Sequence, residues 1–331
     1  MRYGVSGVAL TVFCSLAAVA AQPIPNGEDA FTDRQFRQGG AEYFGKRVDD
    51  YRRLTADPEA VRDRAAAYIG EVVRQAWVVQ DESKWKALRD QGESLRKEGA
   101  TDPLVGSAFA VTVAHSGDGI EKEKAVWKDV LKQFEGTAYS PAWQLAAATR
   151  LTDLSRNRDP SQEAAALKLA GPVALDLLKQ QHDSKELRYV WHELSEFLRL
   201  ADIDQKKALW ESSQELKGTM HPWLWNLWAG EFHISLGWHF RGTGFASKVT
   251  PEGWQKLHEN LKLAEERLED AYRLMPDAPE AASRMISVAK TYRTELSSRD
   301  WFDRAVAAQF DFLPAYNALL SSLLPRWGGS Y

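Results

Sequence analysis

Helical periodicity runs along almost the whole chain of 331 residues and constrains its fold more than any other feature. Apolar side chains recur at steps of three and four, which places them on one face of a helix. The clearest stripes lie in residues 190–198, 257–275 and 281–292. No convincing alternation of apolar and polar residues occurs, and no Asn-Gly hairpin signal lies between such runs. The pattern predicts an all-α chain of thirteen or fourteen helices joined by short loops.

Helix starts are marked by a capping residue followed by proline at the first helical position. The cap oxygen accepts a hydrogen bond from a backbone N–H at the helix start, and proline has no N–H to leave unpaired there. Five such pairs occur, at Asp57-Pro58, Asp102-Pro103, Ser140-Pro141, Asp159-Pro160 and Thr250-Pro251. Two capping boxes are predicted as well, from the spacing of Asp183 with Glu186 and of Asp277 with Glu280.

One segment has the spacing of the second helix of a tetratricopeptide repeat. Ala264, Leu268, Ala271 and Pro276 carry it, with Leu268 where an aromatic side chain is usual. Pro314 ends a second, degenerate helix about 38 residues later, close to the repeat period of about 34. The prediction is a set of tetratricopeptide-like antiparallel helix pairs that form an α-solenoid or an irregular helical array. An irregular helical bundle is the alternative.

The first 21 residues are typical of a secretory signal peptide. Arg2 precedes an almost wholly apolar run over residues 8–20, and Ala18-Val19-Ala20 supplies small residues before a cleavage site. The run is short for a membrane span, although a retained N-terminal anchor is the alternative. Cys14, the single cysteine, lies inside this run, so the mature chain is expected to have no disulfide and no cysteine-bound metal.

Four parts of the chain are predicted from these patterns. They are a signal peptide over 1–21, a linker over 22–30, a helical N-terminal region over 31–220, and a tetratricopeptide-like region over 221–331. Apolar residues make up 44% of the chain, which excludes disorder as its dominant state. The formal net charge of −4 argues against nucleic acid as the main partner. No later stretch is long and apolar enough for stable membrane insertion.

The last third of the chain carries several distinctive blocks. They are Trp238-His-Phe-Arg241-Gly242-Thr243-Gly244-Phe245-Ala246, Val249-Thr250-Pro251-Glu252-Gly253-Trp254, Ala271-Tyr-Arg-Leu-Met-Pro276, Ala281-Ala-Ser-Arg-Met285, Trp301-Phe302-Asp303-Arg304-Ala305, Pro314-Ala-Tyr316 and Pro325-Arg326-Trp327-Gly328-Gly329-Ser330. From about Trp225 onward the chain resembles a group of uncharacterised, often secreted bacterial proteins with tetratricopeptide-like helices.

That resemblance implies a helical fold and export, and it implies no reaction or catalytic residue. Members of the group continue into more helix after the tryptophan-glycine-glycine-serine block, whereas this chain stops at Tyr331. A shortened natural protein and an incomplete piece of a longer one are both compatible with this departure. A repeat array needs a polar closing helix, so the C-terminal cap is the part that the departure affects.

The candidate binding site combines two arginine-glycine loops with nearby tryptophans. It consists of Trp238, Arg241, Gly242, Gly244, Trp254, Arg326 and Trp327. Glycines let backbone N–H groups approach a ligand, and an arginine pairs with a carboxylate or phosphate. The alternative is structural, with the arginines capping helix ends and the glycines making tight turns. The tryptophan-rich segment over 221–239 has the same two interpretations, sugar or peptide binding and core packing.

Catalytic and metal-binding interpretations have weaker support. Glu231 and His233 are the acid–base candidates if the protein is an enzyme. His233 and His239 are six residues apart, which places them on opposite sides of a straight helix and disfavours a metal site. The segment from His192 to Glu196 lacks the second histidine of a zinc-protease helix, so Glu193 and Glu196 are expected on a solvated face.

These observations predict an exported binding or scaffold module, periplasmic or secreted, whose partner is a protein or peptide. Stacked helix pairs create an extended concave surface that suits such a partner. No cofactor, metal or nucleic acid is expected. The alternatives are an envelope hydrolase acting on glycan or peptide, and a purely structural protein.

Overall fold

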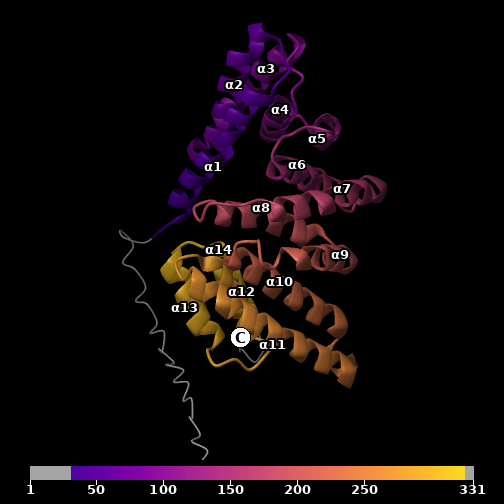
Figure 1. Ribbon diagram of the computed structural model, residues 1–331, viewed down its shortest axis with the longest axis vertical. Helices are drawn as coiled ribbons and strands as arrows, with labels where there is room; N and C mark the ends of the chain where they lie inside the picture. Colours follow the sequence, from indigo (N-terminus) through magenta and orange to yellow (C-terminus); the bar gives the residue numbers. More distant parts are fainter. Residues whose placement is uncertain (1–30, 325–331) are drawn as a thin grey trace, which may run out of the picture.

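The computed structural model describes residues 31–324, and helices alternate with short loops throughout that range (Figure 1). No strand occurs among these residues, so the predicted all-α fold is confirmed. The α-helices are α1 (Asp33–Leu54), α2 (Glu59–Arg74), α3 (Trp85–Lys97), α4 (Pro103–His115), α5 (Ile120–Phe134), α6 (Pro141–Ser155), α7 (Pro160–Lys179), α8 (Leu187–Leu200), α9 (Ile203–Ser213), α10 (Pro222–Arg241), α11 (Pro251–Leu274), α12 (Pro279–Ala289), α13 (Ser298–Ala308) and α14 (Leu313–Ser322).

Four short helical segments complete the described chain. They are a π-helix at η1 (Gln75–Val79) and 3₁₀ turns at η2 (Glu82–Lys84), η3 (Gln214–Leu216) and η4 (Ala246–Lys248). None of the helices within residues 31–324 has the length and apolar character that a membrane crossing requires. The predicted signal peptide and linker lie outside the described residues, as do Arg326 and Trp327 of the candidate site.

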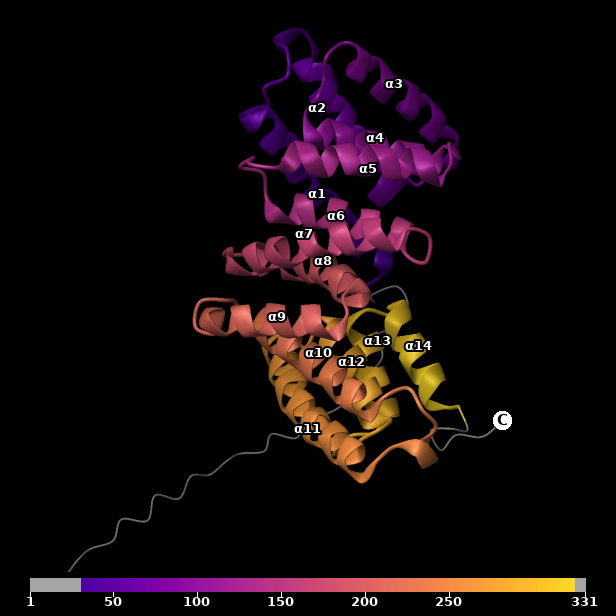
Figure 2. The same cartoon turned by 90° about the vertical axis from the view of Figure 1, so that its right-hand side faces the viewer.

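The helices form an elongated stacked array (Figures 1 and 2). Consecutive helices pack as pairs, for example α4 with α5, α6 with α7, and α10 with α11. Alternate helices pack too, including α2 with α4, α6 with α8, and α12 with α14. Contacts between neighbours and next neighbours build two layers of helices. The apolar stripes found in the sequence face the contacts between layers, as Leu257, Leu261 and Leu268 of α11 do, all fully buried.

Four of the five predicted cap-proline starts are confirmed. Asp102, Ser140, Asp159 and Thr250 are N-caps whose side chains accept a backbone N–H, and proline follows each of them. Asp57 does not cap α2, because its carboxylate is used elsewhere. It is buried and accepts hydrogen bonds from the hydroxyl of Tyr51 and from the backbone N–H groups of Thr101 and Asp102.

Both predicted capping boxes are wrong. Helix α8 begins at Leu187 with Glu186 as its N-cap residue, and the N-cap of α12 is Ala278; neither cap residue makes a side-chain cap bond. Long-range ion pairs hold the two glutamates instead. Glu186 pairs with Lys46 of α1, and Glu280 pairs with Arg188 of α8. Tertiary contacts therefore override the local signal at both helix starts.

Helix α1 contacts parts of the array that are far apart in the sequence. Near its start, the backbone N–H of Phe310 donates to the carbonyl of Phe31 over 3.0 Å. The backbone N–H of Asp33 donates to Oδ1 of Asp311 over 2.6 Å. Further along α1, the rings of Phe36 and Tyr43 stack on Tyr189 of α8 with centroid separations of 4.9 and 5.5 Å. The first described helix thus packs against the middle of the array and reaches the loop before α14.

Candidate functional site

A continuous groove lies along one side of the array. It consists of three adjoining hollows, and the middle one shares Ala146 and Arg150 with the first and Glu196 and Arg199 with the third. We call this feature the central groove. Its first two hollows are lined by Arg47, Val111, Ala114, His115, Glu123, Trp127, Ala146, Thr149, Arg150, Asp153, Glu193, Glu196 and Arg199.

The third hollow is the largest of the three, a cleft of about 550 Å³. It lies between α8 on one side and α10 and α12 on the other, with Phe36 of α1 and Lys206 of α9 at its edges. We call it the junction cleft. Its lining residues are Phe36, Arg188, Trp191, His192, Ser195, Glu196, Leu198, Arg199, Lys206, Glu231, Glu280, Ser283, Arg284, Phe312 and Pro314.

Alternate helices of the stack supply most of the groove. Helix α6 contributes residues 146, 149, 150 and 153, and α8 contributes 192, 195, 196 and 199. Steps of three and four place each set on one face of its helix. The opposite face of each helix is apolar and buried. The groove is therefore the polar face that remains when these amphipathic helices pack by their apolar sides.

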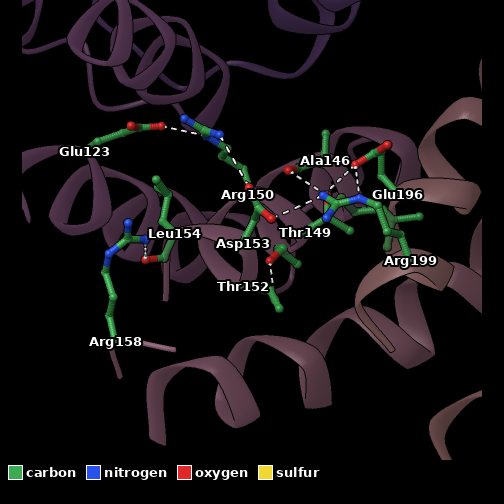
Figure 3. A network of polar contacts seen from close by, with 12 residues as sticks. Glu123, Ala146, Thr149, Arg150, Thr152, Asp153, Leu154, Arg158, Glu196 and Arg199 are labelled. Carbon is green, nitrogen blue, oxygen red and sulfur yellow. Dashed lines mark hydrogen bonds and ion pairs between the residues drawn. The ribbon is translucent and has the colours of Figure 1, made fainter. Parts of the chain in front are cut away.

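A ladder of charged side chains crosses the first two hollows (Figure 3). Nε of Arg150 donates to Glu123 over 2.7 Å, and Nη1 of Arg150 lies 3.8 Å from Asp153. Arg199 then pairs with Asp153 at 3.2 Å and with Glu196 at 2.9 Å. The ladder joins α5, α6 and α8, and its arginines are held in fixed positions facing the groove. Arg150 and Arg199 remain 41% and 48% exposed, so a ligand can reach them.

The end of the groove beside α4 carries a histidine that stacks on a tryptophan. The ring of His115 stacks on Trp85 with centroids 4.3 Å apart. Burial is the main cause that lowers the pKa of His115, and the nearby charge of Arg150 lowers it further. Beside it, Glu123 is buried and accepts hydrogen bonds from Nε1 of Trp127 and from Arg150. The positive charge at this end is thus carried by the arginine.

Glu193 lies beneath the groove and not on the solvated face that the sequence indicates. Its neighbour Glu196 is half-exposed in the ladder, whereas Glu193 is buried. Burial raises the pKa of Glu193, and the charges of His192 and Arg47 partly oppose that rise. Arg47 lies over the rings of Phe44 and Trp143. The expectation failed because α8 is covered on this side by α1, which helical periodicity within α8 does not reveal.

The described part of the sequence-predicted binding site does come together at the far end of the array. Arg241 lies over the rings of Trp238 and Trp254, 5.7 and 5.4 Å from their centroids. Its Nη1 donates to the backbone carbonyls of Gly242 and Gly244. Gly242 has a φ of 72°, which favours glycine, and it follows the last residue of α10. The arginine thus holds the loop that links α10 to α11, and its binding role stays a prediction.

The two acid–base candidates point to different surroundings. Glu231 lines the junction cleft and lies 3.1 Å from Nε of Arg284. His233 is two residues further along α10, about 200° around the helix. Its Nδ1 lies 3.1 Å from Oδ1 of Asn260, and its ring lies beside Trp210 and Phe232. Burial lowers the pKa of His233. The structure does not bring these two side chains into one pocket.

The tryptophan-rich segment mainly fills the core between helices. Trp225 and Trp228 are buried, and both lie against the ring of Trp210 of α9. Nε1 of Trp228 donates to the hydroxyl of Ser213. Trp238 is half-buried beside Arg241. Core packing therefore accounts for Trp225 and Trp228.

Neither a search for metal-binding clusters nor comparison with known proteins gives a further indication of function. Within residues 31–324, no group of three histidine, cysteine or acidic side chains is arranged to hold a metal ion. The chain matches no protein-family model, no curated protein and no solved structure.

The sequence did contain a signal for the central groove. Polar residues interrupt the otherwise apolar helix α6 at Thr149, Arg150 and Asp153, and α8 carries His192, Ser195 and Glu196 at matching spacing. The structure places His192, Ser195 and Glu196 in the wall of the groove and Glu193 beneath its floor. What the sequence could not show is that the polar faces of α6 and α8 adjoin.

Proposed function

We propose that the protein is an exported binding module whose central groove receives an extended segment of a partner protein. The signal-like N-terminus supports export to the periplasm or beyond the cell, and the stacked helix pairs support a tetratricopeptide-like architecture. The observation that carries the proposal is the central groove itself, a continuous channel along α4, α6 and α8 with two exposed arginines fixed along its length.

The chemistry of the ladder suits a peptide backbone. A peptide offers alternating carbonyl acceptors and N–H donors, and the ladder offers guanidinium donors next to carboxylate acceptors. The side chains are fixed by the ion pairs they make with one another, so little side-chain entropy is lost when a ligand binds. A surface ladder with no ligand would contribute little to stability, because exposed ion pairs are each worth about 0–1 kcal/mol.

The hydrolase alternative has less support. Acid–base catalysis requires the two groups in one site, and Glu231 and His233 leave α10 in different directions. The purely structural alternative leaves the exposed polar groove without a role.

A peptide selection tests the proposal. A random library of displayed peptides is selected against the mature chain, and the affinity of selected peptides is measured by fluorescence anisotropy. The double variant Arg150→Gln/Arg199→Gln should weaken binding about tenfold or more, because hydrogen bonds to charged groups contribute about 1.5–3 kcal/mol. Thermal unfolding of each variant verifies that the fold is retained.

Arg158→Gln provides the matched control. Arg158 lies in the turn that follows α6, is exposed, and donates to the carbonyl of Leu154 (Figure 3). It does not line the groove. Its substitution makes the same arginine-to-glutamine change and removes one positive charge, against two in the double variant, and it should change peptide affinity less than about twofold. Selected peptides that bind the double variant as tightly as the unchanged protein would overturn the proposal, as would a selection that yields no binding peptide.

A further inference from the structure

The charged residues of the junction cleft are matched in pairs, with one exception. Arg188 pairs with Glu280 at 2.7 Å, Arg199 with Glu196 at 2.9 Å, and Arg284 with Glu231 at 3.1 Å. The fourth basic side chain, Lys206, has no carboxylate within ion-pair distance among residues 31–324. Its Nζ donates to the hydroxyl of Ser235 over 3.0 Å. Among the residues that line the cleft, four lysine and arginine side chains face three carboxylates, so the lining has an excess of one positive charge. Arg199 also pairs with Asp153 of the adjoining hollow.

Contacts with α10 define the position of the Lys206 ammonium group. Ser235 and Glu231 lie one turn apart on α10, so Lys206 approaches the face of α10 that carries Glu231. Arg284 reaches Glu231 from α12. Lys206 and Arg284 therefore flank Glu231 from two helices.

The lysine is also poorly solvated. Burial is the main cause that lowers the pKa of Lys206; the charges of Glu231 and Asp202 oppose this and that of Arg284 adds to it. A half-buried ammonium group with no ion-pair partner is destabilised relative to one in water. An anion beside this ammonium group would replace the hydration that it has lost. A charge-assisted hydrogen bond there would therefore contribute to binding.

We propose that the junction cleft binds a carboxylate group of the peptide ligand, held between Nζ of Lys206 and the Nη groups of Arg284. The Nη groups suit this role because the ion pair with Glu231 uses Nε of Arg284, whose side chain is 43% exposed. Lys206 has three N–H donors, and Ser235 takes one of them. This inference rests on the proposed function, since it assigns the end of the central groove to one chemical group of the ligand.

The cleft favours a single negative charge over a phosphate. Glu196, Glu231 and Glu280 all line it, and a dianion would be repelled by these carboxylates. A carboxylate matches the excess of one positive charge. Trp191, Phe36 and Phe312 provide apolar wall beside the charged groups, which suits the carbon atoms that carry the carboxylate. The C-terminus of a peptide and an aspartate or glutamate side chain both supply this group.

Protection of individual lysines from reductive methylation tests the proposal on the full mature chain. Three probes are used: N-acetyl-pentaalanine with a free C-terminal carboxylate, the same peptide as its C-terminal amide, and the amide with a central glutamate. Mass spectrometry follows methylation at Lys206 and Lys207. The free acid, the glutamate peptide or both should slow methylation of Lys206, the plain amide should not, and Lys207 should be unaffected.

The outcomes separate the two sources and can overturn the inference. Protection by the free acid alone assigns the cleft to a chain terminus, and protection by the glutamate peptide assigns it to an acidic side chain. Protection by all three probes to the same extent, or by none, overturns the proposal. Because methylation is read at Lys206 itself, this result does not depend on peptides selected through the ladder.

A substitution series gives the second readout. Lys206→Gln should weaken the binding of carboxylate-bearing peptides selected on the groove about tenfold. Conversion of the peptide carboxylate that binds in the cleft to an amide should have a similar effect. Lys207→Gln is the control, since Lys207 is adjacent, pairs with Asp204 at 3.6 Å and does not line the cleft. Peptides that bind Lys206→Gln unchanged but fail to bind Arg150→Gln/Arg199→Gln would overturn the carboxylate site and leave the groove proposal standing.

Discussion

Arg188 donates from Nε to Oε1 of Glu280 over 2.7 Å, although 92 residues separate them in the chain. Its Nη2 donates to Oε1 of Gln309 over 2.7 Å, and its guanidinium lies 4.6 Å from the ring centroid of Phe36. One side chain of α8 thus contacts α1, α12 and the end of α13. Both partners of the ion pair are largely buried, with 13% and 7% of their side chains exposed. This contact connects the two parts of the array across the junction cleft.

Removal of that arginine should destabilise the whole array. Arg188→Met leaves the buried carboxylate of Glu280 without its ion-pair partner, and breaking a buried pair costs about 3–5 kcal/mol. Urea unfolding measures the free energy. Lys179→Met is the control, because Lys179 and Asp176 are both about half-exposed and their pair should contribute less than about 1 kcal/mol. Equal losses in the two variants would show that the buried pair has no special role.

The buried carboxyl of Glu193 should give a pH dependence of stability. Its pKa in the folded protein is raised by burial, so the folded state binds this proton more tightly than the unfolded state. Stability is therefore lost as the pH rises from the unfolded pKa of about 4.3 through the folded pKa. Glu193→Gln cannot ionise. Its stability relative to the unchanged protein should rise with pH over that window and then level off.

Unfolding in urea at a series of pH values from about 4 to 8 measures this difference. Glu196→Gln serves as the control, since Glu196 is 42% exposed and paired with Arg199. It makes the same carboxylate-to-amide change at a half-exposed position and so controls for the substitution itself. A constant difference for Glu193→Gln across the series would contradict the assigned shift.

Local signals in the sequence were sufficient for the helices and most of their starts. Asp102, Ser140, Asp159 and Thr250 cap helices because each needs only a backbone N–H two or three residues away. Asp57 fails for a physical reason, since three donors from distant positions compete for its carboxylate. The outcome of that competition depends on packing, and a single-sequence pattern contains no information on it.

The central groove also depends on packing that the sequence does not reveal. Helical spacing predicts that Arg150 and Asp153 share a face, and that His192, Glu196 and Arg199 share another. The distance of 3.2 Å between Arg199 and Asp153 depends on how α6 packs against α8. The loop around Arg241 was easier to find, because its glycines and tryptophans lie within a short segment and close a local structure.

A glycine in α10 should prove essential for the close packing of α10 against α11. A Cβ at Gly230 would lie 2.6 Å from Cγ of Leu268, a side chain that is fully buried and cannot withdraw. Gly230→Ala should therefore lower stability by about 1–3 kcal/mol through overpacking. Thermal and urea unfolding provide the measurement.

Gly45→Ala is the matched control for that substitution. Gly45 is in the middle of α1, and a Cβ there would have nothing within 4 Å. Alanine at this position should raise stability by about 0.5–1 kcal/mol, because it reduces the freedom of the unfolded chain. Opposite signs for the two glycine substitutions are expected. A neutral or stabilising Gly230→Ala would show that α10 and α11 can separate at little cost.

Substitution of Arg241 distinguishes a structural role from a binding role for the loop that links α10 to α11. Its guanidinium holds two loop carbonyls and lies against Trp238 and Trp254. Arg241→Ala should lower stability by about 1–2 kcal/mol, through lost hydrogen bonds and lost packing of the arginine stem. Arg241→Lys should recover part of the packing and little of the hydrogen bonding, since the planar fork of the guanidinium is lost.

Peptides selected on the central groove should bind both variants as they bind the unchanged protein, once unfolding curves show that the fold is intact. A large loss of peptide affinity with unchanged stability would assign the ligand to Trp238, Arg241 and Trp254 and would move the binding site from the groove to the end of the array.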